Sequence, residues 1–239
     1  MNTPCLADEM RVPRGVICAV GGGGKTSLLN RLAEELSARG RVLRLTTTHI
    51  VAPSTGLVLL SPTPEALSKA FEQSPLVTVG EDNGDGRLRV PACPLEPLEA
   101  LADYVLIEAD GSRQLPVKAA AGHEPALPGN EALVIAVAGM SALGRPIAQA
   151  AHRPERYAAL VGKPQSALIT PGDMARVLTH AEGGQRKGVK GRFAVVLNQC
   201  DDETRLLHAR EAAEFIPYDC FFTAFQSRPD FLESRRLPC

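Results

Sequence analysis

The chain has 239 residues, 44% of them hydrophobic, and its 26 lysines and arginines against 27 aspartates and glutamates give a formal net charge of -1. This length fits one large domain, and the near-neutral charge excludes a general surface for nucleic acid or anionic membranes. Six widely spaced cysteines without a C-x-x-C pair argue against a zinc site or a disulfide framework. Because no long apolar run or apolar N-terminal segment occurs, we expect a soluble, cytoplasmic protein.

The first motif in chain order is a run of four glycines in VICAVGGGGKTSLL, residues 16–29. An apolar run typical of a strand precedes the glycines, and apolar residues at spacings of three and four follow them from 28 to 36. Strand, glycine loop and helix in this order form a phosphate-binding loop, in which backbone N–H groups and the helix dipole bind phosphate oxygens.

Each residue of this loop has an expected role. Lys25 would reach the β- and γ-phosphates of a nucleotide, and the Thr26 hydroxyl would bind Mg²⁺. Ala19 replaces the first glycine of the usual G-x-x-x-x-G-K-[ST] pattern. The alternatives are a chance glycine-rich turn or a loop that binds a non-nucleotide anion. The predicted nucleotide-binding residues of the loop are Gly21, Gly22, Gly23, Gly24, Lys25, Thr26 and Ser27.

Apolar runs alternate with helical patterns along the rest of the chain. Further strands are predicted in the runs that begin at Arg41, Tyr104, Ala132 and Arg192, and helices at 26–38, 63–72, 95–102, 146–161, 171–180 and 202–214. Nearly continuous apolar strands separated by helices are typical of a parallel sheet covered on both faces. Asn-Gly and Asp-Gly pairs predict a small antiparallel hairpin insertion at about 75–92. We therefore predict one α/β domain over 1–239, with a P-loop NTPase-like, mostly parallel sheet.

The strand that follows the first helix ends in Thr-Thr-Thr-His-Ile, residues 46–50. In a parallel sheet the carboxyl ends of neighbouring strands lie together, so this end would face the γ-phosphate. Thr48 and His49 are therefore candidate contacts for a second substrate. An ordinary threonine-rich strand with a structural histidine is the alternative.

Two acidic residues follow the apolar strand in DYVLIEADGS, residues 103–112. Glu108 and Asp110 would lie at the carboxyl edge of the sheet, and the spacing Glu108-x-x-Gly111 resembles the D-x-x-G turn of P-loop GTPases. One carboxylate would hold Mg²⁺ and the other would orient an attacking water or an acceptor hydroxyl. Which of the two has which role stays open, and an ordinary solvated strand end is the alternative.

A third polar strand end occurs in VVLNQCD, residues 195–201. Asn198 and Asp201 have the spacing of the N-K-x-D motif, in which the Asp accepts hydrogen bonds from guanine and the Asn contacts the base and fixes the loop. Gln199 replaces the lysine of that motif, so the choice between ATP and GTP stays open. Before this strand, the Gly/Lys/Arg-rich loop at 182–192 is either solvated or contacts a phosphate or a partner.

Together these segments resemble the YqeC-type family of accessory proteins for selenium-dependent hydroxylases. The matching segments are GGGGKTSLL, TTTHI, VLIEADGSRQLPVKAAAGHEPALP, GRPIAQAAHRP and VVLNQCD, which occur between about residues 15 and 205. The resemblance implies a P-loop nucleotide-binding protein associated with the maturation of selenium-dependent molybdenum hydroxylases, through a labile selenium-containing cofactor.

The resemblance also draws attention to cationic residues that follow the acidic strand end. Alone, each of them is more often a surface group or a helix cap than a ligand. Beside a γ-phosphate they would stabilise transferring charge or bind a small anionic second substrate. These candidates are Arg113, Lys118, His123, His152 and Arg153. The acidic Glu124 directly follows His123 in the same segment.

The sequence therefore favours an enzyme that hydrolyses a nucleoside triphosphate or transfers its phosphoryl group with Mg²⁺. Lys25, Glu108, Asp110 and Arg113 are its predicted catalytic residues, and Thr26, Glu108 and Asp110 its predicted Mg²⁺ ligands. Expected partners are ATP or GTP, a small anionic substrate and a selenium-dependent molybdenum hydroxylase, without nucleic acid or membrane. The alternative is a nucleotide-gated chaperone or adaptor for the hydroxylase or its molybdenum cofactor, with negligible catalysis.

Overall fold

The computed structural model of the protein describes residues 5–46, 50–51, 55–82, 84 and 87–237. The candidates Thr48 and His49 lie outside these ranges. The strands are β1 (Gly15–Gly21), β2 (Val42–Thr46), β3 (Ile50–Val51), β4 (Leu57–Leu60), β5 (Leu76–Asp82), β6 (Arg87–Arg89), β7 (Tyr104–Glu108), β8 (Val117–Lys118), β9 (Glu131–Gly139), β10 (Ala151–His152), β11 (Arg192–Asn198), β12 (Asp219–Ala224) and β13 (Arg228–Arg235). The helices are α1 (Leu6–Glu9), α2 (Lys25–Ser37), α3 (Pro64–Gln73), α4 (Glu96–Glu99), α5 (Ile147–Ala150), α6 (Pro154–Val161), α7 (Pro171–Thr179) and α8 (Glu203–Glu214), with a 3-10 turn at Met140–Ala142.

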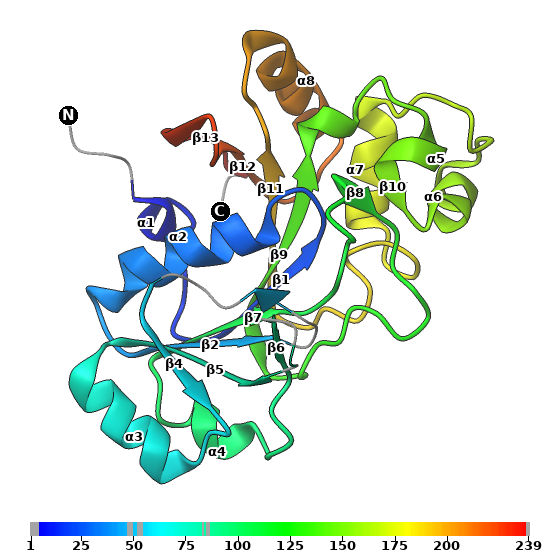
Figure 1. Ribbon diagram of the computed structural model, residues 1–239. Helices are drawn as coiled ribbons and strands as arrows, with labels where there is room; N and C mark the ends of the chain where they lie inside the picture. Colours follow the sequence, from blue (N-terminus) through cyan, green and yellow to red (C-terminus); the bar gives the residue numbers. More distant parts are fainter. Residues whose placement is uncertain (1–4, 47–49, 52–54, 83, 85–86, 238–239) are drawn as a thin grey trace.

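One large sheet forms the centre of the molecule (Figure 1). Its strands follow the order β13-β12-β11-β9-β1-β7-β2-β5-β6-β3. β4 also pairs with β5, on the edge opposite β2. The strands from β12 to β5 and the β4–β5 pair run parallel, whereas β13, β6 and β3 pair antiparallel. The prediction of a mostly parallel α/β sheet of the P-loop NTPase-like class is confirmed.

Both faces of this sheet are covered by helices. The strands from β12 to β5 contribute to two cores, because successive strand residues point to opposite sides. Ile17 and Ala19 of β1 pack in a core with α1 and α2, while Val16, Cys18 and Val20 belong to a second core with α3, α4, α6, α7 and α8. In Figure 1, α1 and α2 lie over one face of the sheet. No helix of the described residues has the length and apolar character that crossing a bilayer requires.

The predicted hairpin is present, but its first arm is part of the main sheet. β5 pairs in parallel with β2 and β4 and only its last two residues, Glu81 and Asp82, pair antiparallel with β6. Val77 and Val79 are fully buried, because they point into the core that contains α3 and α4. The antiparallel addition is therefore limited to β6 and its partner β3.

The single helix predicted at 146–161 is wrong. Ala151 and His152 leave the helical path and pair in parallel with β8, and Arg153 has a left-handed φ of 63°. Pro154 disfavours a helical conformation at the preceding residue and is well suited to begin a new helix. The segment therefore consists of α5, a strand pair and α6. The helix predicted at 95–102 is shortened to α4.

The C-terminal hairpin β12–β13, which the apolar pattern did not predict, extends the sheet on the side of β11. Cys220, Phe221 and Phe222 of β12 are buried. The segment therefore contributes to the core and brings the end of β12 beside the end of β11.

Candidate nucleotide site

The candidate site is formed at the carboxyl ends of five neighbouring parallel strands. β1 lies between β7 and β9, with β2 beyond β7 and β11 beyond β9. Ligands of open parallel sheets bind outside these ends. The glycine loop, defined here as Gly21–Gly24, leaves β1 at this edge and leads directly into α2.

Two of the glycines show why the loop requires this residue type. A Cβ atom at Gly22 would lie 2.6 Å from the carbonyl oxygen of Leu115, a distance that no real contact allows. Gly24 has a φ of 135°, which residues with a side chain rarely adopt. The backbone N–H of Gly22 donates to Val137 over 2.9 Å. The loop therefore packs tightly between β9 and the segment that follows β7.

The second half of the loop presents backbone N–H groups to solvent. Gly23 and Gly24 are half-buried and Thr26 is exposed. The hydrogen bond from Leu28 N to Gly24 O, at 2.9 Å, is the first of α2. Among the described residues, the N–H groups from Gly23 to Ser27 have no acceptor. Unpaired N–H groups at a helix N-terminus favour the binding of an anion such as phosphate.

Lys25 lies beneath this opening with only 3% of its surface exposed. Its ammonium donates to the carbonyl of Gly21 over 2.6 Å and lies 3.2 Å from Asp110 Oδ1 and 3.8 Å from Glu108 Oε1. Its charge is thus placed under the glycine loop, between the two predicted acidic residues.

Asp110 holds the start of the glycine loop. Both of its oxygens accept from the N–H of Gly21, at 3.1 and 3.0 Å, and the buried carboxylate also pairs with Lys25 and with Lys118. Because a buried carboxylate is stabilised only when such donors surround it, this geometry favours a positioning role for Asp110.

Glu108 faces the open side instead, next to the first turn of α2. Its Oε2 accepts from the Thr26 hydroxyl over 2.9 Å. Burial raises the pKa of Glu108, while Lys25 and Thr26 favour its ionised form. The sequence left open which acid holds the metal, and the contacts favour Glu108.

A Mg²⁺ ion fits this pair of oxygen ligands. Mg²⁺ at nucleotide sites is held by one or two protein oxygens together with phosphates and water, and the Thr26 hydroxyl and Glu108 carboxylate are already hydrogen-bonded neighbours. The described part of the chain contains no group of three or more His, Cys, Asp or Glu that could hold a metal without other ligands. Any Mg²⁺ here would therefore need further ligands, such as phosphate oxygens or water.

Lys118 continues the network away from the loop. Its ammonium has three partners, Asp110 Oδ2 at 3.0 Å, Glu124 Oε2 at 2.9 Å and the Gly111 carbonyl at 2.7 Å. An ammonium has three donors, so all of them are engaged, and the side chain has no exposed surface. Lys118 was predicted near a second substrate, and the structure places it as a buried support behind Asp110.

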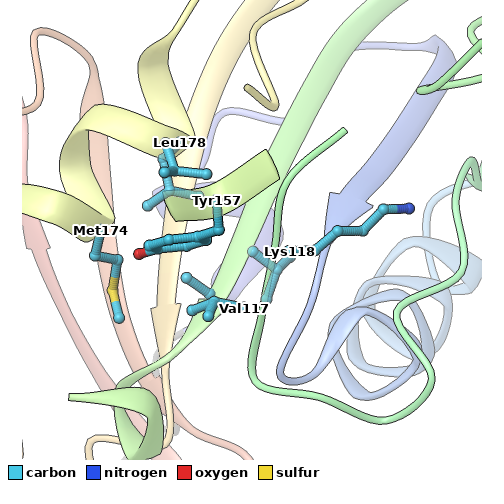
Figure 2. Close-up of a pocket in the computed structure, with 8 residues that line it drawn as sticks. Val117, Lys118, Tyr157, Met174 and Leu178 are labelled. Atoms are coloured by element: carbon cyan, nitrogen blue, oxygen red, sulfur yellow. The ribbon is translucent and has the colours of Figure 1, made fainter. Parts of the chain in front are cut away.

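Figure 2 shows the backbone of Lys118 beside an apolar pocket, with its side chain extending away from Tyr157 and Met174. The pocket is also lined by Val117 and Leu178. Burial raises the pKa of Tyr157, whose hydroxyl has no partner among the described residues. This pocket belongs to the core beneath the sheet, on the opposite side of Lys118 from the glycine loop.

Glu124 and Arg153 end the network, which we call the charge chain (Lys25–Asp110–Lys118–Glu124–Arg153). The guanidinium of Arg153 binds both oxygens of Glu124, at 2.6 and 3.1 Å. Burial alone would raise the pKa of Glu124, but hydrogen bonds from Lys118 and Arg153 lower it to about 2. The predicted candidates Lys118 and Arg153 are thus brought together by a carboxylate.

The other predicted cationic residues lie around the charge chain. His152 pairs with Lys118 in the β8–β10 register. Burial and the charges of Arg153, Lys118 and Arg113 lower the pKa of His152, which favours the neutral imidazole. Arg113 and His123 are exposed, and Arg113 lies in a turn with a left-handed φ of 51°.

Asn198, predicted near the base, fixes the glycine loop. Its Nδ2 donates to the Gly23 carbonyl over 2.8 Å, and its Oδ1 accepts from the Thr223 hydroxyl at 3.1 Å and from Phe225 N at 3.3 Å. The side chain is buried. It therefore ties the ends of β11 and β12 to the loop.

Asp201 lies at the rim of the same region. Its Oδ1 accepts from the Ser227 hydroxyl over 2.5 Å and its Oδ2 pairs with Arg205 at 2.6 Å. About a third of its side chain is exposed. Gln199, which replaces the lysine of the motif, accepts from the Ser141 hydroxyl and has a left-handed φ of 65°.

Several supporting residues were not predicted. Thr223, Phe225 and Ser227 come from the C-terminal hairpin, and Gln185 donates to the Lys118 carbonyl over 2.8 Å. Lys187 donates to the carbonyls of Ala121 and Gly122. The loop at 182–192 thus holds the segment that carries Lys118. Its glycine and lysine content was the only signal, and it does not specify this partner.

These features define an α/β protein with a mostly parallel sheet, whose fold is consistent with the P-loop NTPase-like class. The model of the family described as YqeC protein matches residues 17–155. The chain is also 36% identical over 184 residues to the protein YqeC of Escherichia coli (strain K12), an alignment that covers 74% of this chain and 72% of the relative. No solved structure matches the chain significantly. The chain belongs to the YqeC family.

Proposed function

We propose that the protein binds a nucleoside triphosphate with Mg²⁺ and hydrolyses it or transfers its γ-phosphoryl group. The observation that carries this proposal is the row of N–H groups from Gly23 to Ser27 without an acceptor among the described residues. They lie at the start of a 13-residue helix, above a buried lysine. The cradle is suited to a phosphate chain because N–H groups and ammonium would neutralise its charge.

In this proposal Lys25 stabilises the charge that develops on the phosphates, and Asp110 sets the position of that ammonium. Thr26 and Glu108 would hold Mg²⁺, which neutralises phosphate charge when bound. Catalysis of this kind depends on positioning and electrostatics. The contacts of Asp110 and Lys118 supply the rigid support that such positioning requires.

A small anionic acceptor would bind near Arg113, His152, Arg153 and the exposed His123. Burial and the charges of Arg153, Lys118 and Arg113 lower the pKa of His152, and Glu124 neutralises part of the charge of Lys118 and Arg153. The local field therefore favours an anion on the exposed side of the charge chain. Support for a role in the maturation of a selenium-dependent molybdenum hydroxylase comes from the family resemblance alone.

A titration with ATP and GTP in Mg²⁺ buffer tests the proposal, followed by analysis of products. We expect binding by the wild type and about ten- to hundredfold weaker binding by Lys25→Ala, because hydrogen bonds to a charged group are worth about 1.5–3 kcal/mol. Lys163→Ala, which removes a lysine paired with Asp173 outside the site, should bind as the wild type does. Absence of binding by the wild type would contradict the proposal.

Product analysis separates the possible activities. Nucleoside diphosphate with free phosphate indicates hydrolysis, whereas a phosphorylated acceptor indicates transfer. Tight binding by the wild type without turnover would favour the nucleotide-gated chaperone or adaptor instead.

A further inference from the structure

We infer that the base of the bound nucleotide is guanine and that Asp201 reads it. This inference rests on the proposed function, which it extends from nucleoside triphosphates in general to GTP. The evidence is the way in which the loops after β11 and β12 are joined to each other and to the glycine loop.

The side chains of three residues join these loops. Asn198 links the Gly23 carbonyl to Thr223 and Phe225. Three residues beyond Asn198, the Asp201 carboxylate accepts from the Ser227 hydroxyl. Arg228 donates to the Cys200 carbonyl between them. Asn198 thus ties the segment that carries Asp201 to the glycine loop, and Ser227 fixes the Asp201 carboxylate on that segment.

The chemistry of this carboxylate selects among the bases. Ionised Asp only accepts hydrogen bonds, at about four lone-pair positions, of which Ser227 and Arg205 occupy two. Guanine presents two adjacent donors, the ring N1–H and the exocyclic amine. Adenine presents the bare N1 acceptor at the corresponding position, which a carboxylate repels. The Asp201 site therefore complements guanine.

Asp201 differs in accessibility from the carboxylate that supports the phosphates. Its side chain is 32% exposed, whereas that of Asp110 has no exposed surface. Its partner Arg205 is 36% exposed, and such exposed ion pairs are weak. A base can therefore replace Arg205, while Ser227 keeps the carboxylate in orientation.

The test measures Kd for GTP, ATP and xanthosine triphosphate in Mg²⁺ buffer. We expect the wild type to bind GTP at least about tenfold more tightly than ATP, because hydrogen bonds to a charged partner discriminate to this extent. Asp201→Asn should reverse the preference to xanthosine triphosphate by at least about tenfold. The new amide donates to the carbonyl oxygen that xanthine has in place of the guanine amine.

Asp202→Asn is the matched control. It removes the same charge one residue away and preserves the N-cap of α8, in which Asp202 accepts from Arg205 N at 2.8 Å, because Asn caps as well as Asp. Its GTP-to-ATP ratio should equal that of the wild type.

The outcomes distinguish this inference from the proposed function. Equal affinity of the wild type for GTP and ATP would overturn guanine selection and leave the proposed function standing. A strong GTP preference that Asp201→Asn does not alter would overturn the assignment to Asp201. Failure of the wild type to bind any triphosphate would instead contradict the proposed function. The gain of xanthosine triphosphate binding cannot result from misfolding, so a folding defect does not mimic the supporting result.

Discussion

The two ends of the candidate site are held in different ways. At the phosphate end, Asp110 and Lys118 are fully buried and every donor of the Lys118 ammonium is engaged. At the opposite end, Asp201 and Arg205 form an ion pair with both side chains about one third exposed. Both ends combine carboxylates with cations, yet only the second can change partners without exposing a buried charge.

The difference separates residues that shape the site from residues that are free to bind. A buried ion pair stabilises little by itself, but removal of one partner leaves a charge in a medium of low polarity. An exposed pair contributes little and is easily exchanged. We therefore expect substitutions at the phosphate end to reduce stability and those at the other end to change mainly affinity.

The largest effect is expected for Lys118→Met. The substitution leaves Asp110 and Glu124 without their shared ammonium, and loss of one partner from a buried network costs about 3–5 kcal/mol. The free energy of unfolding from urea denaturation measures this loss.

Arg210→Met provides the comparison, because that arginine also pairs with a carboxylate but is 51% exposed, and its partner Glu233 is 33% exposed. We expect it to cost less than about 1 kcal/mol. Equal losses for the two variants would show that burial does not distinguish the phosphate end.

The second effect is expected for Asn198→Ala. It leaves the Gly23 carbonyl, the Thr223 hydroxyl and the Phe225 N–H without their partner, at a cost of about 1–3 kcal/mol. Triphosphate affinity should fall as well, because the glycine loop loses its support. Asn130→Ala, which removes an exposed hydrogen bond to Glu99, should change neither unfolding nor affinity.

The sequence predicted those parts of the fold in which a local pattern determines the structure. The apolar run before the glycines, the helix after them and the acidic end of β7 follow from periodicity and from the order of strands, and all are present. The break within 146–161 was missed because the pairing of β10 with β8 is a long-range contact. Pro154 was the only local signal of that break.

The site shows the same limit. The sequence brought Glu108 and Asp110 to one edge but left their roles open, because the choice depends on which oxygen faces Gly21 and which faces Thr26. The spacing of Asn198 and Asp201 indicated a joint role at the base. The structure instead gives the two residues different contacts: Thr223 binds Asn198, and Ser227 binds Asp201. Both partners lie in the C-terminal segment, whose sequence pattern did not predict these contacts.

The third prediction concerns acid stability. The folded pKa of Glu124, about 2, lies below its ordinary value of 4.5, so its contribution is present above pH 4.5 and is lost as the pH falls toward 2. After discounting for solvent screening, this contribution is about 1–2 kcal/mol. Urea denaturation at pH 6 and pH 3 should show that Glu124→Gln loses less stability on acidification than the wild type.

Glu211→Gln on the exposed surface of α8 is the control for this measurement. Its free energy of unfolding should fall between pH 6 and pH 3 by as much as that of the wild type. If Glu124→Gln followed the same curve as Glu211→Gln, the pairing of Glu124 with Lys118 and Arg153 would not stabilise the fold.

The smallest effect on stability is expected at the other end of the site. Arg205→Ala and Arg210→Ala each remove an arginine of α8, the first half-buried and paired with Asp201, the second exposed and paired with Glu233. Both should change the free energy of unfolding by less than about 1 kcal/mol. Only Arg205→Ala should strengthen GTP binding, by a few fold, because it frees the carboxylate that we assign to the base. Equal GTP affinity of the two variants would show that Arg205 does not compete with the nucleotide, whereas a large loss of stability in Arg205→Ala would show that this end is as rigidly held as the phosphate end.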